Sequence, residues 1–204
     1  MNEFLLAARQ YWYLWVIFFV LCIVLIIVWK KAAGVAKKRF SRFNESLAAA
    51  EREEALSKRY ESLNFELLLE DSPSDVISGI ALKVQERLDG EPDIKKAFNE
   101  LAEYEKRAYA MHYFFADSRE RLSDFFRRNS APLTPVALAA VRESSFLPAR
   151  DIVLKLYPML DEDNEGVSYD KKTVEELDQS YKSLDSEAFK AAIKEHIIAL
   201  YNNQ

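Results

Sequence analysis

The stretch that decides the fold reads IKKAFNELAEYEKRAYAMHYFFA and spans Ile94 to Ala116. Apolar side chains recur in it at steps of three or four residues, at Ile94, Phe98, Leu101, Tyr104, Ala108, Met111 and Phe115. Because an α-helix has about 3.6 residues per turn, these side chains fall on one face. The sequence therefore predicts one long helix after Glu91-Pro92, with its apolar face buried in a helical core.

Helix signals on both sides of this stretch predict further helices. Ser72-Pro73 suits the start of a helix and Gly90 its end. After Ala116, we expect a short helix capped by Asp117 or Ser118, a helix beginning at Thr134-Pro135, one after Leu147-Pro148 that Pro158 ends or kinks, and two final helices at Lys171–Tyr181 and Asp185–Tyr201. No stretch alternates as a strand, so residues 71–204 are predicted to form an all-α domain.

The N-terminal region predicts a membrane anchor. Residues 13–29 contain no charged side chain, and the 19 residues of the span 11–29 would form a helix of about 28 Å, close to the roughly 30 Å of a bilayer core. Trp12, Trp15 and Trp29 suit the two membrane interfaces. A cleaved signal peptide and a buried core helix are the alternatives. A signal peptide has a shorter apolar core and positive charge before it, whereas here most of the charge follows.

Basic residues near the predicted span indicate its orientation. Arg9 alone precedes it, and six residues follow it closely, namely Lys30, Lys31, Lys37, Lys38, Arg39 and Arg42. Because positive flanks stay on the cytoplasmic side, residues 1–10 are predicted outside the plasma (inner) membrane and the C-terminal domain inside. The basic segment 30–43 either contacts anionic lipid headgroups or serves only as a topology signal.

Residues 44–70 predict a helical stalk, since they are rich in Ala, Leu, Glu, Lys and Arg and lack Gly and Pro. One apolar stripe runs along it through Leu56, Tyr60, Leu63 and Leu67. This stripe could pair with a second copy, giving a homo-oligomer, or it could fold back onto the domain. The sequence leaves both alternatives open.

Charge divides the chain into two parts. Residues 1–43 carry seven of the 28 basic and one of the 33 acidic residues, so residues 44–204 have a net charge of −11, although the whole chain has only −5. An acidic domain is repelled by phosphate backbones, which argues against direct nucleic-acid binding. A basic or mixed protein partner is compatible with it. Cys22, the single cysteine, has no second cysteine for a disulfide or a zinc site.

An acidic segment resembles a calcium-binding loop in part. Asp161, Asp163, Glu165 and Gly166 occupy the first, third, fifth and sixth places of an EF-hand-like loop. The twelfth place, where a bidentate Glu is required, holds Lys172. We therefore interpret the segment as a solvated connection and predict no metal.

The two histidines, His112 and His196, lie among apolar positions of predicted helices and are expected at the boundary of the core. A metal pair with Glu195 or Glu103 has no supporting spacing. Ser144-Ser145 lacks a nucleophile-elbow pattern, and the four glycines form no phosphate-binding loop. The sequence thus predicts no catalytic residue, no cofactor and no small-molecule substrate.

The segment from residue 101 onward resembles a widespread bacterial family of small helical domains, one member of which is described as a DNA mimic protein. The resemblance is carried by EYEKRAYAM at Glu103–Met111 and LSDFF at Leu122–Phe126, and it covers about half of the chain. Where the family has two glycines and a glutamine, this chain has Glu120, Arg121 and Asp124. The resemblance implies an all-helical domain that binds other proteins, in the mimic's case through acidic side chains that stand in for phosphates.

These observations together predict a single-pass, membrane-anchored and non-enzymatic protein-interaction module at the cytoplasmic face. An acidic domain that sequesters a basic DNA-binding or toxin protein is the alternative. An enzyme of unrecognised type is the second alternative. The sequence does not identify the protein partner.

Overall fold

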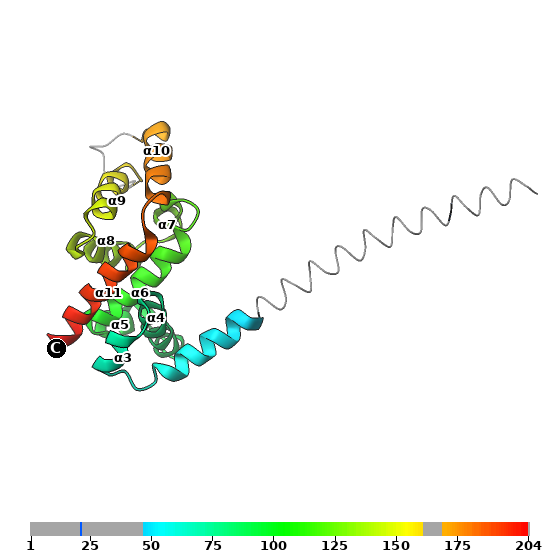
Figure 1. Ribbon diagram of the computed structural model, residues 1–204, viewed down its shortest axis with the longest axis vertical. Coiled ribbons are helices and arrows are strands. Elements are labelled where there is room, and N and C mark those ends of the chain that lie inside the picture. The colour runs from blue at the N-terminus through cyan, green and yellow to red at the C-terminus, as the bar shows by residue number, and fades with distance from the viewer. Residues whose placement is uncertain (1–20, 22–46, 161–168, 204) are drawn as a thin grey trace, which may run out of the picture. The chain divides into compact units, whose positions relative to one another are not determined.

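The computed structural model describes residues 21, 47–160 and 169–203 (Figure 1). These residues form α-helices and connections, and none of them forms a strand. The predicted span 11–29 lies outside the described residues except for Leu21, and the basic segment 30–43 lies outside them entirely. Among the helices that are described, none combines the length and the apolar character needed to cross a bilayer. The chain divides into two compact units, Met1–Arg52 and Glu53–Gln204, and the second holds the core described below.

Residues 47–59 are helical and are followed by nine labelled helices among the described residues (Figure 1). These are α3 (Phe65–Glu70), α4 (Pro73–Asp89), α5 (Ile94–Glu100), α6 (Glu103–Asp117), α7 (Leu122–Arg128), α8 (Leu133–Glu143), α9 (Leu147–Leu160), α10 (Lys171–Lys182) and α11 (Ser186–Asn202).

Helix α6 is the centre of the packing, since it contacts α4, α7, α8 and α11. Helices α7, α9 and α10 pack against one another beside it, and α8 joins them through α9. Phe114 of α6 is fully buried, and its ring lies 5.0 Å from that of Phe125 and 6.1 Å from those of Tyr181 and Phe189. This aromatic cluster joins four helices, and contacts between aromatic rings add to the stabilisation that comes from burying their apolar surface.

Several predicted helix ends are confirmed. The Ser72 hydroxyl accepts a hydrogen bond from the Asp75 backbone N–H, Pro73 occupies the first helical position, and Gly90 ends α4. Helix α11 begins at Ser186, one residue after the predicted start at Asp185, and Asp185 caps it by accepting from two backbone N–H groups. Hydrogen bonds and backbone preferences of nearby residues are sufficient to define these helix ends, which is why they can be predicted from the sequence.

The prediction of one long helix from Ile94 to Ala116 is wrong, because the helix is interrupted between α5 and α6. Leu101 and Ala102 adopt extended conformations there. Leu101 is buried at 4% exposure, and the Glu105 carboxylate accepts a hydrogen bond of 3.0 Å from the Ala102 backbone N–H. The burial of one side chain and this cap stabilise two short helices in place of a continuous one.

The predicted cap of the short helix α7 is also wrong. Asp117 is the last residue of α6, and Ser118 is the residue that ends it. The start of α7 is instead capped by Asp178 of α10, which accepts hydrogen bonds from the Ser123 backbone N–H at 2.8 Å and from its hydroxyl at 2.7 Å. A residue 55 positions away in the chain therefore supplies the hydrogen-bond acceptor for this helix end.

Two further helix ends differ slightly from the prediction. Helix α8 begins at Leu133, just before the expected Thr134-Pro135, because the Thr134 hydroxyl donates to the Asn129 carbonyl rather than capping the helix. Helix α9 continues through Pro158 and is described as far as Leu160, so of the two predicted effects of Pro158 the structure excludes the end of the helix.

The predicted stalk helix does not continue to Glu70. Its helical residues end at Arg59, a turn follows at residues 60–62, and α3 begins at Phe65. Tyr60 is buried at 1% exposure, and the other members of the stripe, Leu56, Leu63 and Leu67, pack against the core. Of the two alternatives for this stripe, the described residues therefore match folding back onto the domain.

Candidate binding cleft

An open cleft of about 590 Å³ lies between the first turns of α4, the last turns of α6 and the connection from α10 to α11. Its volume falls in the range of about 300 to 1,000 Å³ that is common for binding pockets. The three segments come together because α4, α6 and α11 contact one another in the core. The cleft thus depends on the tertiary fold and not on one local motif.

The floor of the cleft is apolar. Ile77 of α4 and Phe189 of α11 are buried, and Phe115 of α6 and Leu184 are half-buried over them. The Phe115 and Phe189 rings lie 5.1 Å apart, and Phe189 stacks on Phe146 with ring centroids 5.6 Å apart. Because these rings belong to the packed core, the floor is preformed.

Two polar pairs lie in the walls. The Ser78 hydroxyl and His112 Nδ1 are 3.3 Å apart, and the Ser118 and Tyr181 hydroxyls are 3.0 Å apart. Burial lowers the pKa of His112, although the charge of Glu53 opposes this shift. Burial also raises the pKa of Tyr181 to about 12. Both groups are therefore uncharged near pH 7 and can offer hydrogen bonds without bringing charge into the cleft.

The rim carries positive charge. Arg119, Lys182 and Lys190 line the cleft, and no carboxylate among the described residues does so. Lys190 Nζ lies 2.7 Å from Glu187 and 6.0 Å from the centre of the Phe115 ring, so its ammonium group is held over the floor. Within the part of the chain that is described, Arg119 has no ion-pair partner. Lys182 also pairs with a glutamate, Glu120 at 3.6 Å, so among the described residues Arg119 is the cation of the rim whose charge no ion pair compensates.

The wall pair Ser78 and His112 is slightly more widely spaced than a typical nucleophile and its base. Their 3.3 Å separation is longer than the roughly 2.6 to 3.2 Å expected between a nucleophile and its base. Within the described ranges, no carboxylate is hydrogen-bonded to the other ring nitrogen of His112 to orient it. The geometry supports binding by this cleft better than nucleophilic chemistry.

The second histidine lies in a different environment. His196 of α11 has its Nε2 atom 3.4 Å from a Glu143 carboxylate oxygen, within ion-pair distance but without hydrogen-bond geometry. Arg107 donates to the Val136 carbonyl at 3.0 Å and lies 3.4 Å from the same carboxylate. Burial lowers the pKa of His196. The two histidines thus have separate partners, and the described residues contain no cluster of potential metal ligands.

Other residues singled out in the sequence lie where the structure gives no description. The EF-hand-like positions Asp161, Asp163, Glu165 and Gly166 fall within residues 161–168, outside the described ranges. The nine predicted membrane-interface residues lie outside them as well. These assignments stay predictions.

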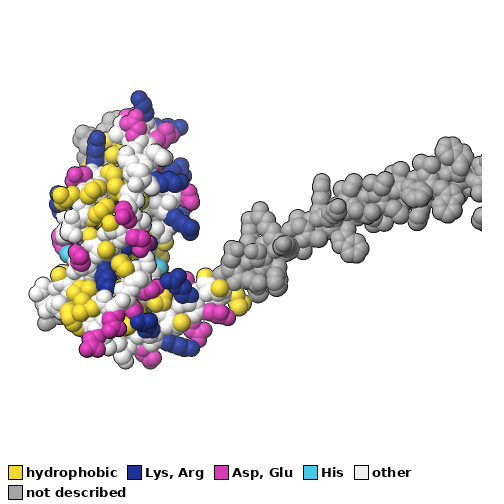
Figure 2. Space-filling model, viewed as in Figure 1, with side chains coloured by type: hydrophobic (Ala, Val, Ile, Leu, Met, Phe, Trp, Pro, Cys, Tyr) yellow, Lys and Arg dark blue, Asp and Glu magenta, His cyan; other side chains and the backbone are white. Residues whose placement is uncertain are grey.

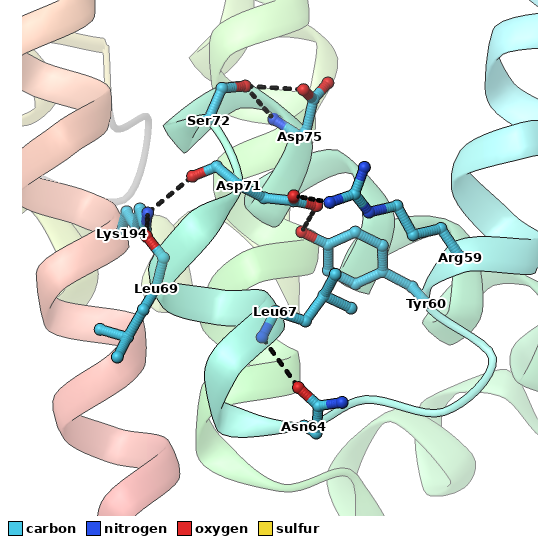
Figure 3. Close-up of polar contacts among 9 residues, drawn as sticks. All are labelled: Arg59, Tyr60, Asn64, Leu67, Leu69, Asp71, Ser72, Asp75 and Lys194. Atoms are coloured by element: carbon cyan, nitrogen blue, oxygen red, sulfur yellow. Dashed lines mark hydrogen bonds and ion pairs between the residues drawn. The ribbon is translucent and has the colours of Figure 1, made fainter.

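A polar junction fastens the N-terminal helix of this unit to α4 and α11 (Figure 3). Asp71, between α3 and α4, pairs with Arg59 and accepts a hydrogen bond of 3.0 Å from the Tyr60 hydroxyl. Lys194 of α11 donates to the backbone carbonyls of Leu69 at 2.9 Å and Asp71 at 2.6 Å. The contacts fix the turn after residue 59 against the domain.

The Tyr60 ring fits against a glycine of α4. A Cβ atom on Gly79 would lie only 2.4 Å from the nearest ring carbon, so a larger residue would collide with the ring. Ser78 and Ile77, one and two positions earlier in α4, line the cleft. The helix therefore carries the junction on one face and the cleft on another.

The sequence did not predict the cleft residues as a group. Their signals are ordinary ones, namely core aromatics on α6 and α11 and single basic residues at helix ends. Comparison with known proteins adds no assignment, since no protein-family model, curated protein or solved structure matches the chain.

Proposed function

We propose that the chain is a membrane-anchored, non-enzymatic interaction module at the cytoplasmic face of a bacterial plasma membrane, and that the cleft is its binding site. The observation that carries this proposal is the preformed apolar floor surrounded by Arg119, Lys182 and Lys190. A concave apolar surface with a few polar groups at its edge is the usual form of a binding site.

The anchor part of the proposal rests on the sequence. Residues 13–29 carry no charge, and basic residues follow them, which favours a retained span with the domain inside. A tethered module meets membrane-bound partners at a high effective concentration, so modest affinity is sufficient. The junction at Asp71 supports this role because it fixes the connecting turn to the domain.

Site-specific photocrosslinking tests the module. A photoreactive amino acid replaces Ala116, an exposed residue that lines the cleft, in the full chain expressed in cells. Ala199 is the matched control, because it is also an exposed alanine within a helix but does not line the cleft. We expect a discrete crosslinked protein from position 116 in the membrane fraction and none from position 199. Identical products at both positions, or a chain that stays in the soluble fraction, would refute the proposal.

The alternative function, sequestration of a basic protein by an acidic surface, is supported by one further observation. Helix α3 exposes Phe65 at 40% and Leu69 at 53%, and Glu66 and Glu70 beside them form no ion pair among the described residues. Figure 2 shows acidic side chains next to hydrophobic ones in the part of the domain where Figure 1 places α3. Capture of a basic protein that weakens steeply with salt would favour this alternative.

The enzyme alternative has no support from the wall pair described above. Turnover of a metabolite by the purified full chain, lost on substitution of His112 by Gln, would support it and would contradict the non-enzymatic proposal.

A further inference from the structure

We propose that the ligand of the cleft is a short acidic segment of a protein partner, with one large apolar side chain on the floor and carboxylates on the rim. This inference rests on the proposed function and names the class of its partner. It follows from the charges of the rim, the floor between them and the neutral groups in the walls.

The rim selects for negative charge. Three cations line the cleft without a carboxylate among the described lining residues. Lys190 and Lys182 have ion-pair partners that do not line the cleft, Glu187 at 2.7 Å and Glu120 at 3.6 Å. Lysine offers three N–H donors, so each ammonium group can keep its partner and still donate to a ligand carboxylate. Arg119 adds a planar guanidinium group suited to bidentate binding of a carboxylate.

The floor selects for an apolar side chain. Phe115 and Leu184 are half-buried and lie over the buried Ile77 and Phe189. An aromatic or leucine side chain placed here would cover the exposed parts of these residues and gain the free energy of burying apolar surface. A ligand with charge alone would leave this surface in contact with water.

The walls suit a peptide backbone. Ser78, Ser118 and Tyr181 carry uncharged hydroxyl groups in the cleft, and such groups can donate to and accept from peptide groups. A long polyanion fits less well, because its charges beyond the rim would meet a domain with a net charge of −11 over residues 44–204. A short segment places its few carboxylates only where the cations are.

The test uses the full chain in nanodiscs of neutral lipid and an array of 12-residue acidic peptides, each with one central Phe or Leu. Binding is measured by fluorescence anisotropy. Each peptide has two matched partners, one with Lys in place of its acidic residues and one with Ser in place of the central apolar residue. We expect peptides that bind the chain and lose at least about tenfold in affinity with either change.

Protein variants locate the binding. Arg119→Gln and Lys190→Gln should each weaken binding at least about tenfold. Lys106→Gln is the control, since Lys106 pairs with Glu103 at 2.9 Å and Lys190 with Glu187 at 2.7 Å, both at i,i+3 spacing and both with the lysine largely buried. This variant should bind like the wild type, and circular dichroism checks that all three are folded.

Several results would overturn the inference. These are an array in which no acidic peptide binds better than its lysine-containing partner, binding unchanged in both cleft variants, and binding equally weakened by Lys106→Gln. Tight binding of vesicles containing anionic lipid, lost in the cleft variants while no peptide binds, would assign the cleft to lipid headgroups instead. If the Ala116 crosslink persists while the peptides fail, the interaction module stands and only this ligand class is wrong.

Discussion

The contact between Gly79 and Tyr60 predicts how replacing Gly79 by Ala changes the stability of the domain. The Tyr60 side chain decides whether this replacement is destabilising or stabilising. Replacing Gly79 by Ala places a Cβ atom 2.4 to 2.6 Å from three ring carbons of Tyr60, whereas carbon atoms prefer about 3.5 to 4.0 Å. The ring must therefore move by about 1 Å. It is buried at 1% exposure, and its hydroxyl is bonded to Asp71, so there is little room to move.

The magnitude follows from two opposing effects. Overpacking of a core costs about 1 to 3 kcal/mol, and displacement of the ring strains its hydrogen bond to Asp71. Alanine, however, favours a helix interior over glycine by about 1 kcal/mol. We expect Gly79→Ala to lower the free energy of unfolding by about 2 kcal/mol, a fall in Tm of about 4 to 8 °C.

A double-mutant cycle provides the sharpest assay. Tyr60→Ala alone should destabilise the domain by about 3 kcal/mol, and in that background the collision is absent. Gly79→Ala should then stabilise by about 1 kcal/mol through helix propensity alone. The four chains are compared by thermal unfolding of the full chain in detergent micelles, followed by circular dichroism.

Gly90, the residue that ends the same helix, supplies the control. A Cβ atom there would meet only the Arg87 carbonyl oxygen at 3.9 Å, and Gly90 has a φ of −86°, which any residue can adopt. Gly90→Ala should thus leave stability unchanged or raise it by up to about 1 kcal/mol. The reasoning fails if Gly79→Ala leaves Tm unchanged, or if it lowers Tm equally with and without the Tyr60 ring.

Three further predictions concern buried polar groups. Asp178→Ala should destabilise by about 2 to 3 kcal/mol in urea unfolding, because the buried Ser123 backbone N–H and hydroxyl lose their acceptor; a loss below about 0.5 kcal/mol would contradict this cap. Burial lowers the pKa of His112, so the unfolded chain binds the proton more readily, and stability should fall as pH decreases below about 6.5. His112→Gln should reduce this dependence of stability on pH, and an unchanged dependence would refute its assignment to His112. Burial raises the pKa of Tyr104 and Tyr181 to about 12, so stability should fall as pH rises above about 10. Tyrosinate absorbance during unfolding measures this effect, and Tyr181→Phe should weaken the dependence of stability on pH.

Local signals identified much of the helical framework. Ser72 with Pro73 and the cap at Asp185 act on backbone groups within three residues, so the sequence contains the whole interaction. The periodic face of the central stretch likewise identified Tyr104, Ala108 and Met111 among the side chains buried in α6. It missed the buried Phe114, and Ile94 on the predicted face is 58% exposed. The same periodicity missed the break at Leu101, because the apolar spacing continues across it while the backbone does not.

Long-range contacts decided what the sequence left open. The cap of α7 comes from α10, and the stripe that could have paired with a second copy folds onto the domain through Tyr60. The wall pair of the cleft, Ser78 and His112, joins two helices from positions 34 residues apart. No local pattern reports such encounters, because each depends on how several helices pack together.

The amino-acid sequence by itself determined the helical class, most helix starts, the acidic character of the domain and the uncharged stretch at residues 13–29. Those properties are set by side chains that act on their near neighbours or on solvent. Only the tertiary structure decided that the cleft forms, which cations line its rim and that Tyr60 packs against Gly79. Close packing brings together residues from distant helices and determines which polar groups lose contact with water.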